Sequence, residues 1–275
     1  MRTIAIIAAK EIQEGLRNRW VLATTLLLAA LALSLTFLGS APTGNVGVGA
    51  LDVVIVSLSS LTIFLLPLIA LLISHDAVVG EMERGTMILL LSYPVGRSQV
   101  ILGKFAGHVL ILGFATVIGY GAAAVALAMT GASVLAASWV AFAAMLGTSV
   151  MLGAVFVALG YLISSMVRDR GTAAGLAVGV WLLMVLVFDM ALLGGLVVDQ
   201  GRFITAHVLN ALLFLNPTDL YRLANLSGLK VSQFSGMSGL AATASLAPSV
   251  LLLGLLAWIV APLGLAMLFF TRREL

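Results

Sequence analysis

Two neighbouring stretches decide the fold of this 275-residue chain: residues 53–73 read VVIVSLSSLTIFLLPLIALLI, and residues 81–104 read EMERGTMILLLSYPVGRSQVILGK. The first stretch is uncharged and has the length of about 20 residues that a helix needs to cross about 30 Å of hydrocarbon. The second has charges on both sides of an apolar run and is too polar to cross. We therefore predict a membrane helix that is followed by an ordered, charged element at the membrane surface.

The composition supports a membrane protein. Hydrophobic residues make up 62% of the chain and charged residues 9%, whereas a soluble domain has about 45–50% and about 25%. The absence of cysteine excludes disulfides, thiolate metal sites and a cysteine nucleophile. A formal charge of +3 gives no indication of a nucleic-acid partner. The apolar composition makes membrane lipid the expected surroundings.

Six apolar segments meet or approach the spanning length, and the predicted fold class is all-α, with six transmembrane helices in a single transmembrane domain over residues 1–275. The runs are continuous, whereas barrel strands alternate over about 10 residues, and a helix satisfies its own backbone in lipid. The predicted spans are Val21–Leu38, Val53–Ile73, Phe105–Met129, Trp139–Val167, Gly171–Val198 and Pro248–Phe270.

The basic residues predict the orientation. Eleven of the fourteen Lys and Arg residues fall in the termini, the 74–104 segment and the short turn at 168–170, and three fall in the other loops. By the positive-inside rule, both termini are expected in the cytoplasm and the long 199–247 loop outside. Residues 1–19 are too charged to span; Ile4, Ile7, Ala8 and Ile12 recur at helical spacing, so we expect an amphipathic interfacial helix, with a frayed tail as the alternative.

The segment 77–93 is predicted as one surface helix, with Asp76 as its N-cap and Pro94 ending it. Lys104 then starts the third span at the membrane interface. One face of the helix should pack on the membrane helices and the other should meet water, where Glu81 and Arg84 can pair. The packing face is formed by Val78, Met82, Gly85 and Leu89.

This helix is either a solvated connector or a docking element for a cytoplasmic partner. A second charged element, SSMVRDRG at 164–171, joins the fourth and fifth spans on the same side. Two such elements, each tied to two spans, would let a soluble motor act on the helices at two points.

The pattern E-x-E-R-G-T followed by P-x-x-R and G-K resembles the first coupling helix of ABC-2 type transporter permeases. The matching residues are Glu81, Glu83, Arg84, Gly85, Thr86, Pro94, Arg97, Gly103 and Lys104. The resemblance implies a non-catalytic, homodimeric membrane subunit in a bacterial inner membrane, with cytoplasmic amphipathic coupling helices. It also implies a cytoplasmic ABC ATPase dimer that binds ATP and Mg²⁺, and a periplasmic partner. The implied ATPase-coupling residues are Glu81, Glu83, Arg84, Gly85, Thr86, Arg97, Arg168, Asp169 and Arg170.

Two longer stretches, HDAVVGEMERGTMILLLSYPVGRSQVILGKFAGH at 75–108 and LNPTDLYRLANL at 215–226, resemble a narrower group. These are the permeases of the system that assembles the copper sites of nitrous oxide reductase. The resemblance implies a role in copper-site maturation. The alternative is a general ABC-2 exporter of a drug, lipid or polymer.

The residues offer no catalytic or metal site. The Walker A pattern G-x-x-x-x-G-K-[ST] is absent, so ATP must be bound by another chain. The three histidines form no pair with zinc-site spacing. Copper prefers soft ligands, but the methionines stand six residues apart, as at 184 and 190, rather than on one helix face. We therefore expect no cofactor on this chain and no copper path through it.

Two polar residues are expected inside the membrane, Asp189 and His108. An intramembrane carboxylate is a functional hypothesis by default. Asp189 could line a dimer cavity, pair with Arg202, or cap the end of a short fifth span. An intramembrane enzyme would need a cluster of such groups, and these two lie on different helices.

The outer loop predicts two short interfacial helices. Asn216 should cap the second, with Pro217 at its first position. Asp219 lies in the first turn of this helix, and Tyr221, Arg222 and Lys230 are expected to face water. The four residues are expected to contact a periplasmic protein; the alternative is a gate that lies on the membrane without a partner.

Overall fold

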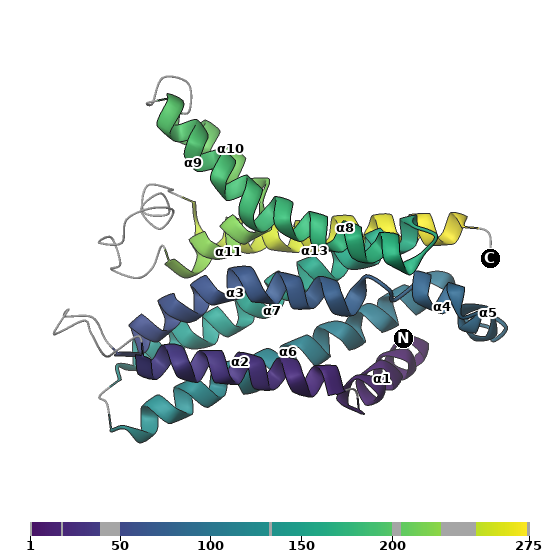
Figure 1. The fold of residues 1–275 in the computed structure, drawn as a ribbon, viewed down its shortest axis with the longest axis horizontal. Coiled ribbons are helices and arrows are strands. Elements are labelled where there is room, and N and C mark those ends of the chain that lie inside the picture. The colour runs from purple at the N-terminus through teal and green to yellow at the C-terminus, as the bar shows by residue number, and fades with distance from the viewer. Residues whose placement is uncertain are drawn as a thin grey trace.

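The computed structural model describes residues 2–17, 19–38, 50–131, 134–199, 205–226 and 246–273, and their regular structure is entirely helical (Figure 1). The elements are α1 (Arg2–Arg17), α2 (Arg19–Leu38), α3 (Ala50–Ser74), α4 (Val79–Glu83), α5 (Thr86–Leu91), α6 (Arg97–Met129), α7 (Ala136–Met166), α8 (Arg170–Leu182), the π-helix η1 (Leu183–Val187), α9 (Phe188–Asp199), α10 (Ala206–Phe214), α11 (Pro217–Leu226) and α13 (Pro248–Arg272).

The helices confirm the predicted fold class. Five segments of the described chain are long and apolar enough to cross a membrane, and a sixth span results when α1 and α2 are counted together as one bent span. The five are Leu51–Glu83, Arg97–Met129, Ala136–Met166, Arg170–Asp199 and Pro248–Arg272.

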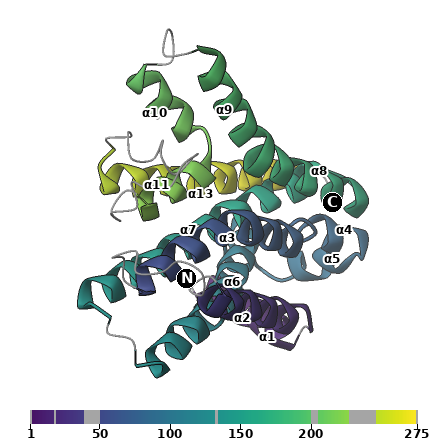
Figure 2. The same cartoon turned by 60° about the vertical axis from the view of Figure 1, so that its left-hand side comes forward.

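Helix α7 lies at the centre of the bundle. It packs against α3, α6, α11 and α13, and its middle is buried on all sides, from Leu152 to Tyr161. Helices α1 and α2 pack on α6, on the side of the bundle away from α13 (Figure 1). The pair α9 and α10 extends away from the other helices, as Figure 2 shows.

Glycines bring α1 and α2 close to α6. A Cβ atom at Gly103 would lie 2.7 Å from Cβ of Ile7, and one at Gly107 would lie 2.5 Å from Cβ of Glu11. Small residues four apart let two membrane helices approach closely. The helix expected within residues 1–19 therefore has a well-defined seat on the third span.

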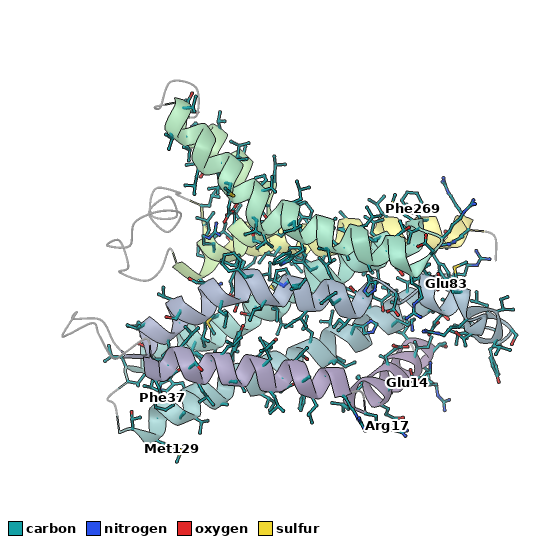
Figure 3. All side chains as sticks on the ribbon, viewed as in Figure 1. Glu14, Arg17, Phe37, Glu83, Met129 and Phe269 are labelled. Atoms are coloured by element: carbon teal, nitrogen blue, oxygen red, sulfur yellow. The ribbon has the colours of Figure 1, made fainter. Side chains whose placement is uncertain are left out.

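The two ends of the bundle differ. Glu83 and Phe269 lie at one end, with Glu14 and Arg17 toward the same end, while Phe37 and Met129 lie at the opposite end (Figure 3). The basic residues predict that the end with Glu83 faces the cytoplasm. We call it the cytoplasmic end and the opposite one the outer end.

Candidate coupling site

The segment 77–93 was predicted to be one helix. In the structure it forms two short helices that meet at Gly85. Gly85 has φ 71°, in the left-handed region, which glycine adopts at little cost. Asp76 is not the N-cap either. The backbone amides of Val78 and Val79, near the start of the segment, both donate to the Ser164 hydroxyl at 3.0 Å.

The turn at Gly85 changes which side chains are exposed. Met87 is fully buried, whereas Leu89, predicted to pack on the membrane helices, is 68% exposed. The exposed side chains of this segment form what we call the coupling surface. It consists of Glu83, Arg84, Thr86, Ile88, Leu89, Ser92 and Tyr93. Large apolar side chains that stay exposed beside charged ones are typical of a protein–protein contact.

Glu81 does not face water, and it pairs with Lys104 instead of the predicted Arg84. It lies with Lys104 and Glu11 in a buried group that we call the inner charge cluster. The Lys104 ammonium is 2.7 Å from a Glu11 carboxylate oxygen and 2.8 Å from a Glu81 oxygen, and the three side chains are at most 13% exposed. Lys104 is therefore not an interface anchor, because α1 and α4 cover it. The cluster joins the first helix, the coupling segment and the third span.

His108 extends this cluster toward α7. Its Nδ1 lies 2.7 Å from the hydroxyl of Tyr161, which is fully buried, and its Nε2 lies 3.8 Å from Glu11. This predicted intramembrane polar residue is thus a link between α6 and α7.

The second predicted coupling element fixes α8 to α4. The Asp169 carboxylate caps α8 by accepting a hydrogen bond from the Thr172 amide at 2.7 Å. This hydrogen bond lowers the pKa of Asp169. The Arg170 amide donates to Glu83 at 2.8 Å, and its guanidinium pairs with Asp76 at 2.7 Å. Displacement of Glu83 would therefore displace the start of the fifth span.

Arg97 is not part of the coupling surface. Its Nη1 donates to the backbone carbonyls of Phe270, Thr271 and Arg273 at 3.0, 3.1 and 2.7 Å. A cation at this position satisfies the free carbonyls at a helix C-terminus. Arg97 therefore holds the last turn of α13 against the start of α6, while Arg168 lines a pocket with Arg272 and Arg273.

The predicted outer contact residues are buried instead of facing water. Asp219 is 1% exposed, Tyr221 0% and Arg222 8%, because α11 packs against α3, α7 and α13. Lys230 lies outside the described residues. The prediction failed because the polar residues of this helix have partners within the chain, as the Tyr221 hydroxyl has in Ser149 at 3.0 Å.

Asp189 pairs with Arg222, which in turn contacts Asp219; we call these three the outer charge cluster. The Arg222–Asp189 distance is 2.6 Å. Arg202, with which Asp189 was expected to pair in one of the three alternatives, lies outside the described residues. Burial raises the pKa of Asp219 to about 7, although Arg222 opposes the shift.

The π-helix η1 ends at Val187, two residues before Asp189. The side chain of Asn216 donates from Nδ2 to the Met184 carbonyl in this π-helix at 2.7 Å, and its Oδ1 accepts from the Thr218 backbone amide at 3.1 Å. The predicted cap of α11 is thus confirmed. Asn216 also bonds the fifth span at a π-helix, an irregularity that is frequent at functional sites.

The sequence reasoning missed Glu11 and Ser164 as site residues. A signal for Glu11 was present, because it follows Ile4, Ile7 and Ala8 at the same helical spacing and so belongs to the apolar face. Ser164 gave no such signal. Among the described residues, no group of three or more His, Asp or Glu side chains is placed to hold a metal ion.

Comparison with known proteins adds to this geometry. The sequence model of the family described as "ABC-2 family transporter protein" matches residues 5–275. The chain is 49% identical over 275 residues, 99% of each chain, to "Probable ABC transporter permease protein NosY" of Stutzerimonas stutzeri. It is 48% identical over 276 residues, 100% of each chain, to the protein of the same name of Pseudomonas aeruginosa. This chain therefore belongs to the ABC-2 family and is a permease subunit of an ABC transporter.

Proposed function

We propose that this permease is a homodimeric, non-catalytic subunit that passes work from a cytoplasmic ATPase to a periplasmic partner during copper-site maturation of nitrous oxide reductase. Family membership implies an ATPase partner in a transporter complex. The names of the relatives, which carry the Nos designation, support the narrower role.

The observation that carries the proposal is the position of the coupling surface. It exposes Ile88, Leu89 and Tyr93 at 59%, 68% and 69% next to Glu83 and Arg84. A soluble ATPase that packs on these apolar side chains would bury them and could pair with the charges. The surface lies at the cytoplasmic end, at the tip of the bundle (Figure 1).

Two rigid links lead from this surface into the membrane. Glu83 accepts from the Arg170 amide, and so moves with α8. Glu81 bonds Lys104, and so moves with α6 and α1. A pull on α4 would therefore reach both α8 and α6.

At the outer end, the outer charge cluster ties α9 to α11. Movement of α8 would pass through η1 to Asp189 and from there to Arg222. In this proposal the fifth span carries the movement and α11 receives it. A periplasmic protein near these helices would sense the change.

Mild-detergent affinity purification from the native host, followed by mass spectrometry, tests the assembly. We expect the permease in two copies with a stoichiometric ATPase and a periplasmic protein in the same peak. Absence of an ATPase, under conditions that preserve other ABC complexes, would contradict the proposal.

The proposal also holds that copper does not pass through this chain. Vesicles that contain the permease and its ATPase, but no periplasmic partner, should show ATP hydrolysis without ATP-driven copper movement. Copper flux in these vesicles would refute force transmission as the function.

A further inference from the structure

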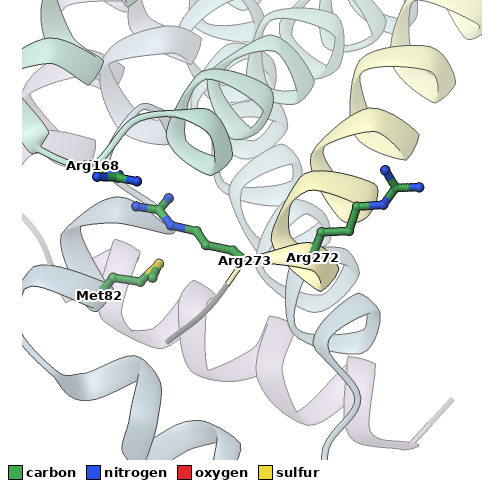
Figure 4. A pocket seen from close by; sticks show the side chains of 4 residues that line it. All are labelled: Met82, Arg168, Arg272 and Arg273. Atoms are coloured by element: carbon green, nitrogen blue, oxygen red, sulfur yellow. The ribbon is translucent and has the colours of Figure 1, made fainter.

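Three arginines line an open cavity at the cytoplasmic end that the coupling proposal does not use. A cavity of about 500 Å³ is lined by Met82, Arg168, Arg272 and Arg273. An adjoining one of about 320 Å³ shares the three arginines and adds Ser165, Met166 and Phe269. Figure 4 shows that Arg168 and Arg273 point toward each other, while Arg272 lies on the other side of the last turn of α13.

The arginines lack an acidic counterpart within the described part of the chain. None of the ion pairs formed there includes Arg168, Arg272 or Arg273. Partial burial lowers the pKa of Arg273, and the like charge of Arg168 lowers it further. The guanidinium groups of Arg168 and Arg273, which point toward each other (Figure 4), fit a phosphate, which each can bind with two parallel hydrogen bonds.

The arginines are held in place by the backbone around them. Arg97 bonds three carbonyls in and after the last turn of α13. Arg273 itself donates to the Ser165 carbonyl at 3.2 Å, which fixes it to the end of α7. The Arg273 side chain and the backbone that carries Arg272 are therefore held in place before any ligand arrives, which lowers the entropic cost of binding.

An apolar track leads from this pocket along the membrane span. Leu265, Leu268 and Phe269 are 45%, 55% and 43% exposed, and Arg272 follows them on the same face of α13 at helical spacing. Met166, 58% exposed, ends α7 beside them. A cationic pocket above an exposed apolar track fits a phospholipid, with its phosphate at the arginines and its acyl chain along α13. An acidic side chain of a soluble protein would leave the track uncovered.

We propose that Arg168 and Arg273 bind the phosphate of an anionic phospholipid of the cytoplasmic leaflet, whose acyl chain lies along Leu265, Leu268 and Phe269. Arg272 adds its positive charge at the edge of the same pocket. Basic pockets between spans on this side are suited to anionic headgroups. The site does not depend on the proposed copper-site role. It would fix the height of α13, and with it the Arg97 contact, relative to the membrane surface.

The test is native mass spectrometry of the purified full-length permease complex, titrated with phosphatidylglycerol or with phosphatidylcholine. The variant Arg168→Gln/Arg272→Gln leaves the Arg273 bond to Ser165 intact. The variant Arg2→Gln/Arg17→Gln removes the same charge from α1 and serves as the control. At about 1 kcal/mol per arginine and 1.4 kcal/mol per factor of ten, the pocket variant should bind phosphatidylglycerol about 30-fold more weakly than the control.

Three results would overturn the proposal. The first is equal phosphatidylglycerol binding by the pocket variant and its control. The second is displacement of the lipid by soluble glycerol phosphate at equal concentration, which would show that the acyl chain contributes nothing. The third is loss of the ATPase from the pocket variant with unchanged lipid binding, which would assign the arginines to an acidic patch of the ATPase.

Discussion

At the scale of single residues, the structure rests on two buried groups of charges. Each places one cation between two carboxylates: Lys104 between Glu11 and Glu81, and Arg222 between Asp189 and Asp219. A buried charge is costly without its partner, although replacing a whole buried group by apolar residues is often tolerated. The main effect of the clusters is therefore to determine which helices stay together. Their net contribution to stability is smaller.

Replacing Lys104 by methionine should destabilise the protein strongly. Glu11 and Glu81 would then face each other without a cation, at a cost of roughly 3–5 kcal/mol. Thermal unfolding in detergent, followed by size-exclusion chromatography, measures the effect. Lys10→Met, which breaks the exposed Lys10–Glu14 pair, should cost less than about 1 kcal/mol.

The combined variant Glu11→Gln/Lys104→Met/Glu81→Gln separates charge from packing. It removes all three charges and should recover most of the lost stability. A triple variant as unstable as Lys104→Met alone would argue against an electrostatic origin of the effect.

Asp219 should make stability depend on pH. Its pKa is raised to about 7 in the folded chain, from an ordinary value near 3.9, so between these values the folded state binds more protons than the unfolded one. Stability should therefore fall as the pH rises from about 4 to about 7, and level off at higher pH. Asp219→Asn should remove this slope in detergent unfolding measurements. An identical slope in both proteins would show that another group titrates.

At the scale of elements, glycines decide how the N-terminal helix is seated. The seat at Gly107 leaves no room for a side chain, because a Cβ atom would lie 2.5 Å from Glu11. Gly121 on the same helix has no heavy atom within 4 Å of such a Cβ. The pair offers a matched test of close packing.

Gly107→Leu should displace α1, whereas Gly121→Leu should not. Because the chain has no cysteine, a single cysteine placed at Ala8, which is 8% exposed, reports the displacement. Maleimide labelling should become faster in the Gly107→Leu background only. Equal labelling in both backgrounds would mean that α1 is not held by this contact.

At the scale of the whole molecule, hydrophobicity alone predicted the helices but not the contacts of their charges. Five of the six predicted spans are spanning helices in the structure, and the first counts as one only together with α1. An uncharged run such as 53–73 was predicted correctly because it has few alternatives. Lys104 and Arg222 were placed toward the interface and toward water because a single sequence does not show that helices distant along the chain, α1 and α6 or α9 and α11, meet there.

The coupling segment was predicted in part, for a related reason. The pattern around Glu81–Thr86 located the element, yet Gly85 was taken as one position of a continuous stripe. Its left-handed conformation ends α4 and starts a second helix, α5, which buries Met87 and leaves Leu89 exposed. Neither helical spacing nor composition distinguishes a glycine within a helix from one that ends it.

The measurement that tests the coupling surface most directly is ATPase recovery and turnover with the purified variants Arg84→Gln and Ile88→Ser/Leu89→Ser, with Arg17→Gln as control. All three change exposed residues, so each permease should elute and unfold as the unaltered chain does. We expect the two surface variants to lose bound ATPase or its turnover, and the control to keep both. Unchanged ATPase binding and turnover in both surface variants would contradict the account, because the partner would then dock elsewhere.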